Sequence, residues 1–131
     1  SSLYDRSLSF QAAEAALRQG EELAAISTPT QFPTSGACVA GRCPILVDPA
    51  ATVLAGGGLA ATWTRDAAGN DATTAVPRYI VENMGEAPNW PGCDREIPQQ
   101  PTCMSPRYRV TASSNAQERA QVILQTNFAA P

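Results

Sequence analysis

The first 25 residues of the chain predict a single long helix with one apolar side. Apolar residues recur every seven positions, and small residues fill the same side of the helix between them. Taken to about Ala25, the helix would be about 36 Å long at 1.5 Å per residue, which is long for a globular chain of this size. The residues on this side are Leu3, Phe10, Ala13, Ala16, Leu17, Gly20 and Ala24.

The helical pattern is already in register at the first residues, so we expect the chain to begin inside a longer helix. A mature secreted protein stays open as the alternative, because Ser2 with Asp5 three residues on would form a capping box. Ser27 and Pro29 cannot continue the helix, which we therefore expect to end by Ile26.

Three alternating segments after Pro77 predict strands over 78–84, 107–112 and 120–128. Each has one apolar and one polar face, which is typical of an antiparallel sheet covered on a single side. The N-terminal helix is the only predicted element long enough to cover that sheet. The predicted core between helix and sheet consists of Leu3, Phe10, Ala13, Leu17, Tyr108, Val110, Val122 and Leu124.

The length of 131 residues predicts one domain. It divides into the helix (1–26), a long irregular region (27–77) and a sheet region (78–131). Within the irregular region, Asp48-Pro49 predicts a short helix that Gly56-Gly57-Gly58 ends, and Leu59 to Arg65 predicts a short strand containing Trp63. The expected fold class is α+β, with the long helix packed on a three-to-four-stranded antiparallel sheet.

The four cysteines fall as two close pairs, Cys38 with Cys43 and Cys93 with Cys103. Neither pair has the CxxC spacing of a zinc ribbon or a thioredoxin-like site. Three connectivities are open, and we predict the local one, Cys38–Cys43 and Cys93–Cys103. Two disulfides indicate an oxidising compartment, so we expect the protein to be exported from the cytoplasm.

Composition excludes several kinds of function. All nine basic residues are Arg, there is no Lys or His, and the net charge is −3, so nothing indicates nucleic-acid binding. Without His or Lys, a Ser–His or Cys–His nucleophile pair and side-chain Schiff-base chemistry are excluded. No run of eighteen apolar residues exists to span a membrane. We expect no enzyme activity, no cofactor and no metal.

Two groups of residues with carboxylate or amide side chains could suggest a metal site or catalysis, which we do not favour. Asp66, Asn70 and Asp71 surround a glycine, but they lack the ligand spacing of a calcium-binding EF-hand loop and predict an Asx-rich turn. Asp94 and Glu96 form the best carboxylate pair for catalysis. Arg95 between them favours their ionised forms, against the needs of a general acid.

Contacts with a partner protein are predicted at two places. Leu8, Ala12 and Ala15 are displaced around the helix from its sheet-facing side and are candidates for a neighbouring subunit. Trp90, in the NWPGC string, lies on a loop where an aromatic residue could anchor a partner. Packing of Trp90 over the nearby disulfide stays open as the alternative.

Four sequence strings resemble the PilX-type minor pilins of Gram-negative type IV pili. The RxxSFQAAEAALRxGE string begins at Arg6 and PRYIVE begins at Pro77, and YRVTA is followed by AQVILQT in the same order. Together they cover the helix and all three strands, somewhat under half of the chain. The resemblance implies a pilin-like fold and a non-enzymatic function.

The resemblance also implies partners and a location. Such proteins are held in the inner membrane by an apolar N-terminal helix, which we expect to precede this chain, and face the periplasm before assembly. They join other minor pilins, a PilY-type tip adhesin and the major pilin, in a complex that primes pilus assembly and lies at the pilus tip.

Two other readings stay open. A minor pseudopilin of a type II secretion system would share the fold but cap a different filament. A secreted carboxylate-dependent hydrolase would instead need a cleft around Asp94 and Glu96.

Overall fold

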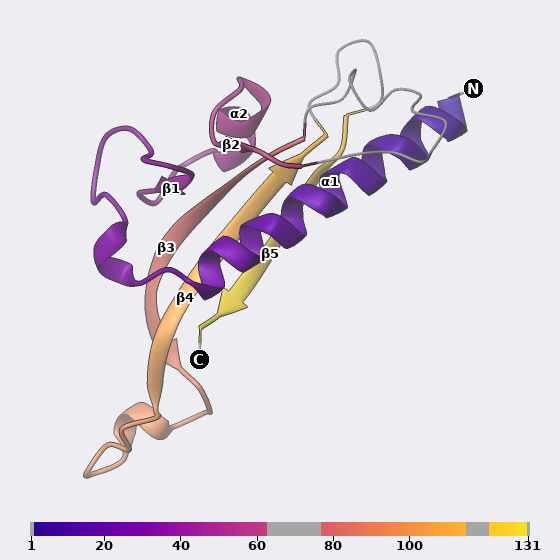
Figure 1. Cartoon of the computed structure of the whole chain (residues 1–131). Helices are drawn as coiled ribbons and strands as arrows, with labels where there is room; N and C mark the ends of the chain where they lie inside the picture. The colour runs from indigo at the N-terminus through magenta and orange to yellow at the C-terminus, as the bar shows by residue number, and fades with distance from the viewer. Residues whose placement is uncertain (1, 63–76, 115–120, 131) are drawn as a thin grey trace.

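The computed structural model describes residues 2–62, 77–114 and 121–130, without the side chains of residues 2–6. A long helix crosses one face of a sheet, and an arm projects from one end of the sheet (Figure 1). The elements in chain order are α1 (Ser2–Ala25), η1 (Pro29–Gln31), β1 (Arg42–Cys43), α2 (Pro49–Leu54), β2 (Leu59–Ala60), β3 (Arg78–Pro88), η2 (Cys93–Arg95), β4 (Met104–Ser113) and β5 (Ile123–Ala129).

The sheet has the strand order β1-β3-β4-β5, and β2 also pairs with β3. β3, β4 and β5 form the predicted antiparallel meander. β1 instead runs parallel to β3, with Arg42 beside Val81 and Cys43 beside Glu82. The α+β class and the packing of the helix on the sheet are confirmed, but the sheet is mixed. A two-residue strand inside an irregular loop has no alternation for sequence reasoning to detect.

α1 ends at Ala25, as predicted, and touches the sheet through small residues. A Cβ atom on Gly20 would overlap the Val110 side chain and lie 3.2 Å from the ring of Tyr79. The backbone of the helix is therefore so close to β3 and β4 that large side chains cannot occupy the centre of the contact. The buried residues along this side of α1 are Leu8, Ser9, Ala12, Ala13, Ala16, Gly20 and Ala24.

The predicted orientation of the helix was wrong at three residues. Phe10, expected to face the sheet, is 45% exposed. Leu8 and Ala12, expected to face a neighbouring subunit, are only 9% and 0% exposed. The prediction followed the seven-residue repeat, which consists mainly of large apolar residues. The helix lies so close to the sheet that its small residues make the contact instead, and these lie further around the helix. Ala13 is buried and Leu17 packs at the margin of the core, as predicted.

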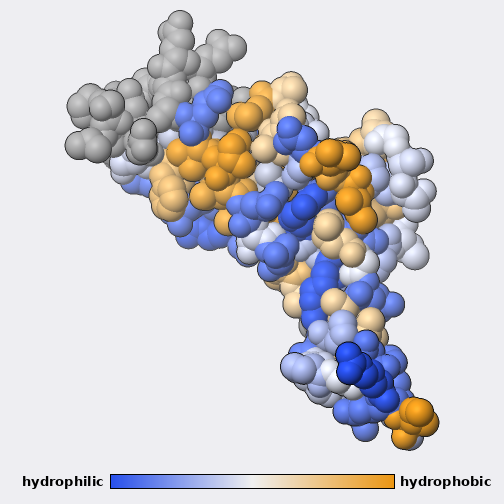
Figure 2. Space-filling view, turned by 180° about the vertical axis from the view of Figure 1, so that it is seen from behind, coloured by the Kyte–Doolittle hydropathy of each residue, from blue (hydrophilic) through white to orange (hydrophobic). Residues whose placement is uncertain are grey.

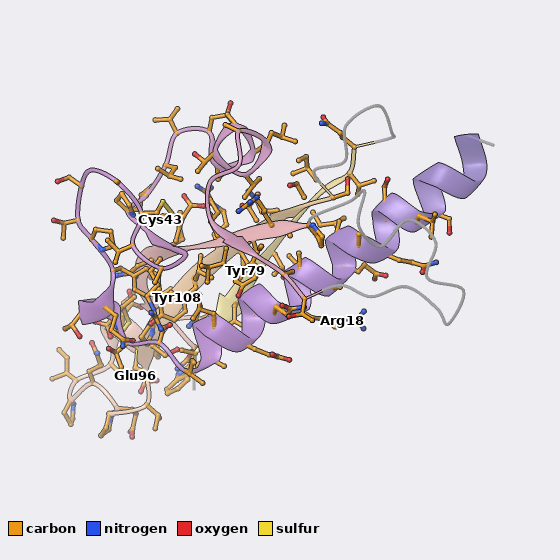
Figure 3. All side chains as sticks on the ribbon, turned by 45° about the horizontal axis from the view of Figure 1, so that its top comes forward. Arg18, Cys43, Tyr79, Glu96 and Tyr108 are labelled. Carbon is orange, nitrogen blue, oxygen red and sulfur yellow. A yellow bond between two sulfur atoms is a disulfide. The ribbon has the colours of Figure 1, made fainter. Side chains whose placement is uncertain are left out.

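The sheet-facing residues of β4 are also as predicted, because Tyr108 and Val110 are fully buried under α1. Tyr108 stacks on Phe32, with ring centroids 5.1 Å apart, and its hydroxyl donates a 3.5 Å hydrogen bond to the Ser27 carbonyl. Tyr79 enters the same layer from β3 (Figure 3). The core therefore joins the sheet to the C-terminal end of α1.

The opposite face of the sheet was expected to be solvated, and over β3 and β4 that prediction was wrong. Ile80 and Thr111 are fully buried there, and Ile80 packs against Val53 of α2 and Cys43. α2 and the loop before it cover this face, so the sheet lies between two layers. The loop gave no sequence signal long enough to be recognised as a second covering element. β5 and Val122 just before it keep the predicted alternation, with Val122, Leu124, Thr126 and Phe128 half-buried and the residues between them exposed.

α2 begins as the sequence predicts. The Asp48 carboxylate accepts a 3.1 Å hydrogen bond from the backbone N–H of Ala51, and Pro49 occupies the first turn. The helix stops before the three glycines, and Gly58 adopts a positive φ of 84°. A Cβ atom there would collide with Tyr79 and Ile80, so a glycine is required where the chain passes under β3.

β3 and β4 extend beyond the predicted bounds and form the arm that projects at the bottom of Figure 1. The pairing register shifts between Asn83 and Glu86, where Gly85 has a φ of 89° and donates to the Asn83 side chain at 3.0 Å. The bulge lets the strand continue through a glycine that sequence reasoning takes as its end. Pairing then resumes as far as Pro88 with Met104.

Several predictions fall outside the described residues. These are the side chain of Leu3, the part of the predicted strand that contains Trp63, and the turn with Asp66, Asn70 and Asp71. Of the predicted strand from Leu59 to Arg65, the structure shows β2. No helix in the described part of the chain is both long and apolar enough to cross a membrane.

Candidate interaction surface

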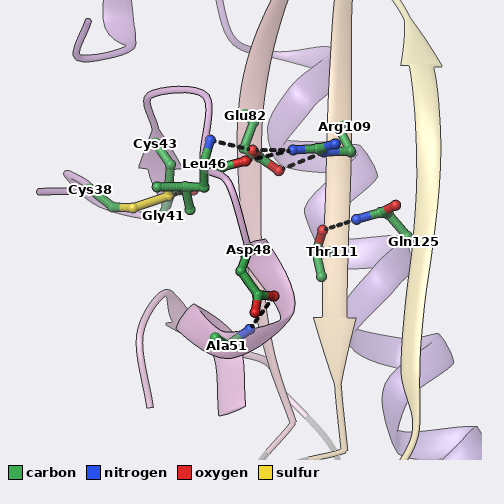
Figure 4. A network of polar contacts seen from close by, with 10 residues as sticks. All are labelled: Cys38, Gly41, Cys43, Leu46, Asp48, Ala51, Glu82, Arg109, Thr111 and Gln125. Carbon is green, nitrogen blue, oxygen red and sulfur yellow. Dashed lines mark hydrogen bonds and ion pairs between the residues drawn. A yellow bond between two sulfur atoms is a disulfide. The ribbon is translucent and has the colours of Figure 1, made fainter. Parts of the chain in front are cut away.

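An ion pair between a fully buried carboxylate and a partly exposed arginine attaches the irregular loop to the sheet. Glu82 of β3 is fully buried and faces Arg109 of β4. Arg109 Nε donates to Glu82 Oε1 at 2.9 Å, and Nη2 donates to Oε2 at 2.6 Å, so the contact is bidentate. Glu82 Oε2 also accepts from the N–H of Leu46 at 2.9 Å, and Arg109 Nη2 donates to the Leu46 carbonyl at 3.2 Å (Figure 4).

The contact with Glu82 favours the charged form of Arg109. The hydrogen bond to Glu82 raises the pKa of Arg109, and the charge of Glu82 adds to that effect, while burial opposes it. The pair satisfies both the backbone N–H and the backbone carbonyl of Leu46. A loop residue without strand partners is therefore hydrogen-bonded where it meets the sheet. We name Glu82, Arg109 and the Leu46 peptide the loop clamp.

The Cys38–Cys43 disulfide is formed, as predicted, and holds the loop beside the clamp. Cys43 is fully buried and sits in β1 directly beside Glu82. Arg42 adds a contact with the end of the helix, because its Nε donates to Ser27 Oγ at 2.9 Å. The loop is thus fixed to α1, β3 and β4 together, which gives its outer surface a defined shape.

A cleft of about 360 Å³ opens between this loop and the base of the arm. Its lining is rich in proline and apolar groups, and Ile45 at its margin is exposed. Val47, two residues on, is exposed as well. The residues that line the cleft are Pro29, Phe32, Pro33, Thr34, Pro44, Ile45, Asn83, Met84 and Gly85.

The base of the arm is held by a second polar network around Arg107. Arg107 Nη1 donates to Ser105 Oγ at 2.6 Å, and Nη2 donates to the Pro88 carbonyl at 3.1 Å and to Asn89 Oδ1 at 2.9 Å. Ser105 Oγ donates to the same Asn89 oxygen at 2.8 Å. One guanidinium therefore bridges β3 and β4 where the strands leave the body.

The end of the arm is closed by the predicted Cys93–Cys103 disulfide. Both cysteines are fully buried, while Ile97 between them is 98% exposed. Figure 2 shows an apolar group at this distal end, separated from the apolar groups on the body. An isoleucine held in water by a disulfide-closed loop is a candidate contact for another protein.

Trp90 is half-buried at the base of this loop, and its indole Nε1 donates to Glu96 Oε2 at 3.4 Å. Whether it contacts a partner stays a prediction. Asp94 and Glu96 are both exposed, and neither lines the clefts found in the described residues. This arrangement gives no support to the hydrolase reading.

On the helix, only Ala15 of the three predicted partner residues is available at the surface. It is half-buried, whereas Leu8 and Ala12 belong to the contact with the sheet. Phe10 is the large apolar residue that the helix exposes in the described range.

The loop clamp was missed by sequence reasoning, although a signal for it exists. Glu82 directly follows the apolar string YIV and has the same strand phase as Ile80, so it points into the face that α2 covers. Arg109 stands between Tyr108 and Val110 in the other strand, on the polar face of the alternation, which the sequence predicts to be solvated. A charge of each sign, placed within apolar strands that pair, could have suggested the contact.

The comparisons with known proteins fit this geometry. The chain matches the family described as type IV pilus assembly protein PilX, C-terminal, over residues 22–130. The match includes the end of α1, the loop, both disulfides and the five strands seen in the described residues. No curated protein and no solved structure matches the chain. Because the family covers most of the sequence, the chain belongs to the PilX C-terminal family of type IV pilus assembly proteins.

Proposed function

We propose that this protein is a minor pilin of the complex that primes type IV pilus assembly and lies at the pilus tip. The family match supports a role in pilus assembly. The single observation that carries the finer proposal is the disulfide-closed arm, which presents Ile97 at 98% exposure on a base held by Arg107. A rigid projecting loop of this kind is suited to binding other proteins.

The proposed partners are other minor pilins, a PilY-type tip adhesin and the major pilin. The loop surface around the cleft and the arm would contact these proteins, while the helix–sheet unit holds both in place. The two disulfides support assembly in the periplasm before transfer to the pilus tip at the cell surface. Anchoring in the inner membrane by an apolar helix preceding this chain is part of the same proposal.

The function proposed is non-enzymatic. The exposed carboxylates of Asp94 and Glu96 and the paired, buried carboxylate of Glu82 support that assignment. The type II secretion alternative shares the fold, and the family match favours the pilus.

The experiment is co-purification of the full-length protein, expressed in its own bacterium, followed by immunoblotting for each class of partner. We expect pilus minor pilins and the PilY-type adhesin to be retained, and surface pili to be lost on deletion of the gene. Retention of secretion pseudopilins with normal pili would contradict the proposal. An Ile97→Asp variant tests the arm, and Arg18→Asp on the exposed side of α1 is its matched control.

A further inference from the structure

The outer edge of β5 is a second candidate site for binding another protein. β5 is the last strand of the sheet, and no strand in the described part of the chain pairs with its outer side. Its pairing with β4 runs without a shift from Ile123 with Ser113 to Ala129 with Arg107. The edge is therefore regular in register, seven residues long and unpaired by any strand of the described residues.

The hydrogen bonds at its two ends fix which backbone groups are free. Ser114 donates to the Val122 carbonyl at 3.1 Å, and Ala130 donates to the Pro106 carbonyl at 3.0 Å. In an antiparallel ladder the groups of alternate residues point the same way. The N–H and C=O groups of even-numbered residues therefore face β4, and those of Ile123, Gln125, Asn127 and Ala129 face outward.

The usual protections of an edge strand are missing from β5. Soluble proteins discourage edge-to-edge pairing with charged side chains, prolines, bulges or very short strands. The sequence of β5, ILQTNFA, has no charge and no proline, and its register has no bulge. The opposite edge of the sheet differs, because β1 and β2 cover β3 there and the arm beyond them is bulged.

The flank of α1 beside β5 indicates what kind of segment would bind. Gln19 exchanges hydrogen bonds of 2.7 and 2.9 Å with Thr62, just after β2, so that flank of the helix faces β2. The other flank, on the side of β5, carries one stripe at helical spacing. That stripe consists of Phe10, Glu14, Leu17 and Glu21, and exposed Arg18 lies beside it, so two carboxylates and one guanidinium leave this flank negative.

We propose that the outer edge of β5 binds an extended segment of another protein, which adds a strand to the sheet and carries at least one Lys or Arg. Backbone hydrogen bonds supply the pairing, as in other cases of strand addition. The basic residue lies near Glu14 and Glu21, which are partly exposed, and an apolar one packs near Phe10 or Ile123, which are also exposed.

A second copy of this chain fits the edge less well. Two β5 strands paired about a two-fold axis would bring their α1 flanks together, so two flanks that each carry Glu14 and Glu21 against a single Arg18 would approach each other. Like charges in that position oppose self-association. The acidic flank thus favours a basic segment from a different protein.

The test uses two synthetic nine-residue peptides that alternate Val and Thr, one with two lysines and one with two glutamates in their place. NMR of the isotopically labelled protein with millimolar peptide follows the backbone amides of β5. We expect the lysine peptide to slow hydrogen exchange at Gln125 and Asn127 at least fivefold, and to bind at least fivefold tighter than the glutamate peptide.

Three variants control the result. Asn127→Pro removes an outward N–H without breaking the Thr126–Val110 pair, and should weaken binding at least tenfold. If that variant does not fold, Asn127→Lys adds a repelling charge at an exposed position and should also weaken binding of the lysine peptide. Asn127→Ser keeps the backbone N–H and leaves the position uncharged, so binding should persist.

The proposal would be overturned if no outward amide of β5 exchanged more slowly with peptide present. It would also be overturned if Asn127→Lys bound the lysine peptide as tightly as the unchanged protein, or if the protein dimerised through β5 as its concentration rose. The assay contains no other pilus protein, so its failure would leave the proposed pilus role standing.

Discussion

Arg109 and Glu82 pair across β4 and β3 through two hydrogen bonds of 2.9 and 2.6 Å, and both also bond the Leu46 peptide. The pair does more than join two strands that already pair along their backbones. It fixes the irregular loop to the sheet, next to the Cys38–Cys43 disulfide. The shape of the cleft-bearing surface therefore depends on a fully buried carboxylate and its partly exposed guanidinium partner.

Removing one member of the pair should be strongly destabilising. Arg109→Met leaves the fully buried carboxylate of Glu82 without its counter-charge, which typically costs about 3–5 kcal/mol. Urea unfolding followed by circular dichroism would measure the loss. The double variant Glu82→Met/Arg109→Met should recover at least half of it, because no lone charge remains. Strictly additive losses would contradict the clamp, and Arg18→Met is a matched surface control.

Gly20 should not tolerate a side chain, although alanine is the better helix former by about 1 kcal/mol. The added Cβ would overlap Val110, so we expect Gly20→Ala to lower the free energy of unfolding by about 1–3 kcal/mol. Shortening the obstructing side chain with Val110→Ala should reduce the penalty of the Gly20 change. If Gly20→Ala instead stabilises the protein in urea unfolding, α1 is not as close to the sheet as described.

The two disulfides should differ in what they stabilise. Each closes a short loop and is expected to contribute about 2–3 kcal/mol. Replacing Cys38 and Cys43 with serine should expose the amides around Leu46 and Val53 to hydrogen exchange, because β1 and the clamp lose their support. Replacing Cys93 and Cys103 should raise exchange mainly within the arm. Identical exchange patterns in the two double variants would contradict this division.

Alkaline pH should destabilise the fold through its buried tyrosines. Burial raises the pKa of Tyr108, and burial together with the charge of Glu22 raises the pKa of Tyr79, both from an ordinary value of 10.0. The folded state therefore holds these protons more tightly than the unfolded state. Their stabilising contribution is complete below pH 10.0 and is lost as the pH rises through the folded-state pKa values.

Ultraviolet absorbance of the phenolate would follow these titrations in the folded protein. Tyr79→Phe and Tyr108→Phe should each remove one late-titrating step and flatten the decline of stability above pH 10.0. If both tyrosines titrated with their ordinary pKa of 10.0 in the folded protein, the layer under α1 would be open to water.

Much of the fold could be predicted from local patterns. The length of α1, the cap at Asp48 and the three main strands each follow from a few neighbouring residues. The local pairing of the cysteines was also predicted correctly. These features depend on helix ends, turn residues and strand alternation, which the chain shows within short windows.

What was missed depends on residues far apart in the sequence. The rotation of α1 follows from the fit of Gly20 against Val110 and Tyr79, which no helical pattern reveals. The burial of Glu82 follows from a loop that arrives from the other side of the sheet. The arm extends because a bulge at Gly85 carries the strand through a residue that normally ends one.

Site-specific photocrosslinking from the arm tests the proposed function most directly. A photoreactive amino acid in place of Ile97 in the full-length protein should, in piliated cells, form a crosslink to another minor pilin or to the PilY-type adhesin. The same amino acid in place of Arg18, on the exposed side of α1, is the positional control for the arm. Crosslinks from position 97 to secretion pseudopilins, or to no pilus protein while pili assemble normally, would contradict the account.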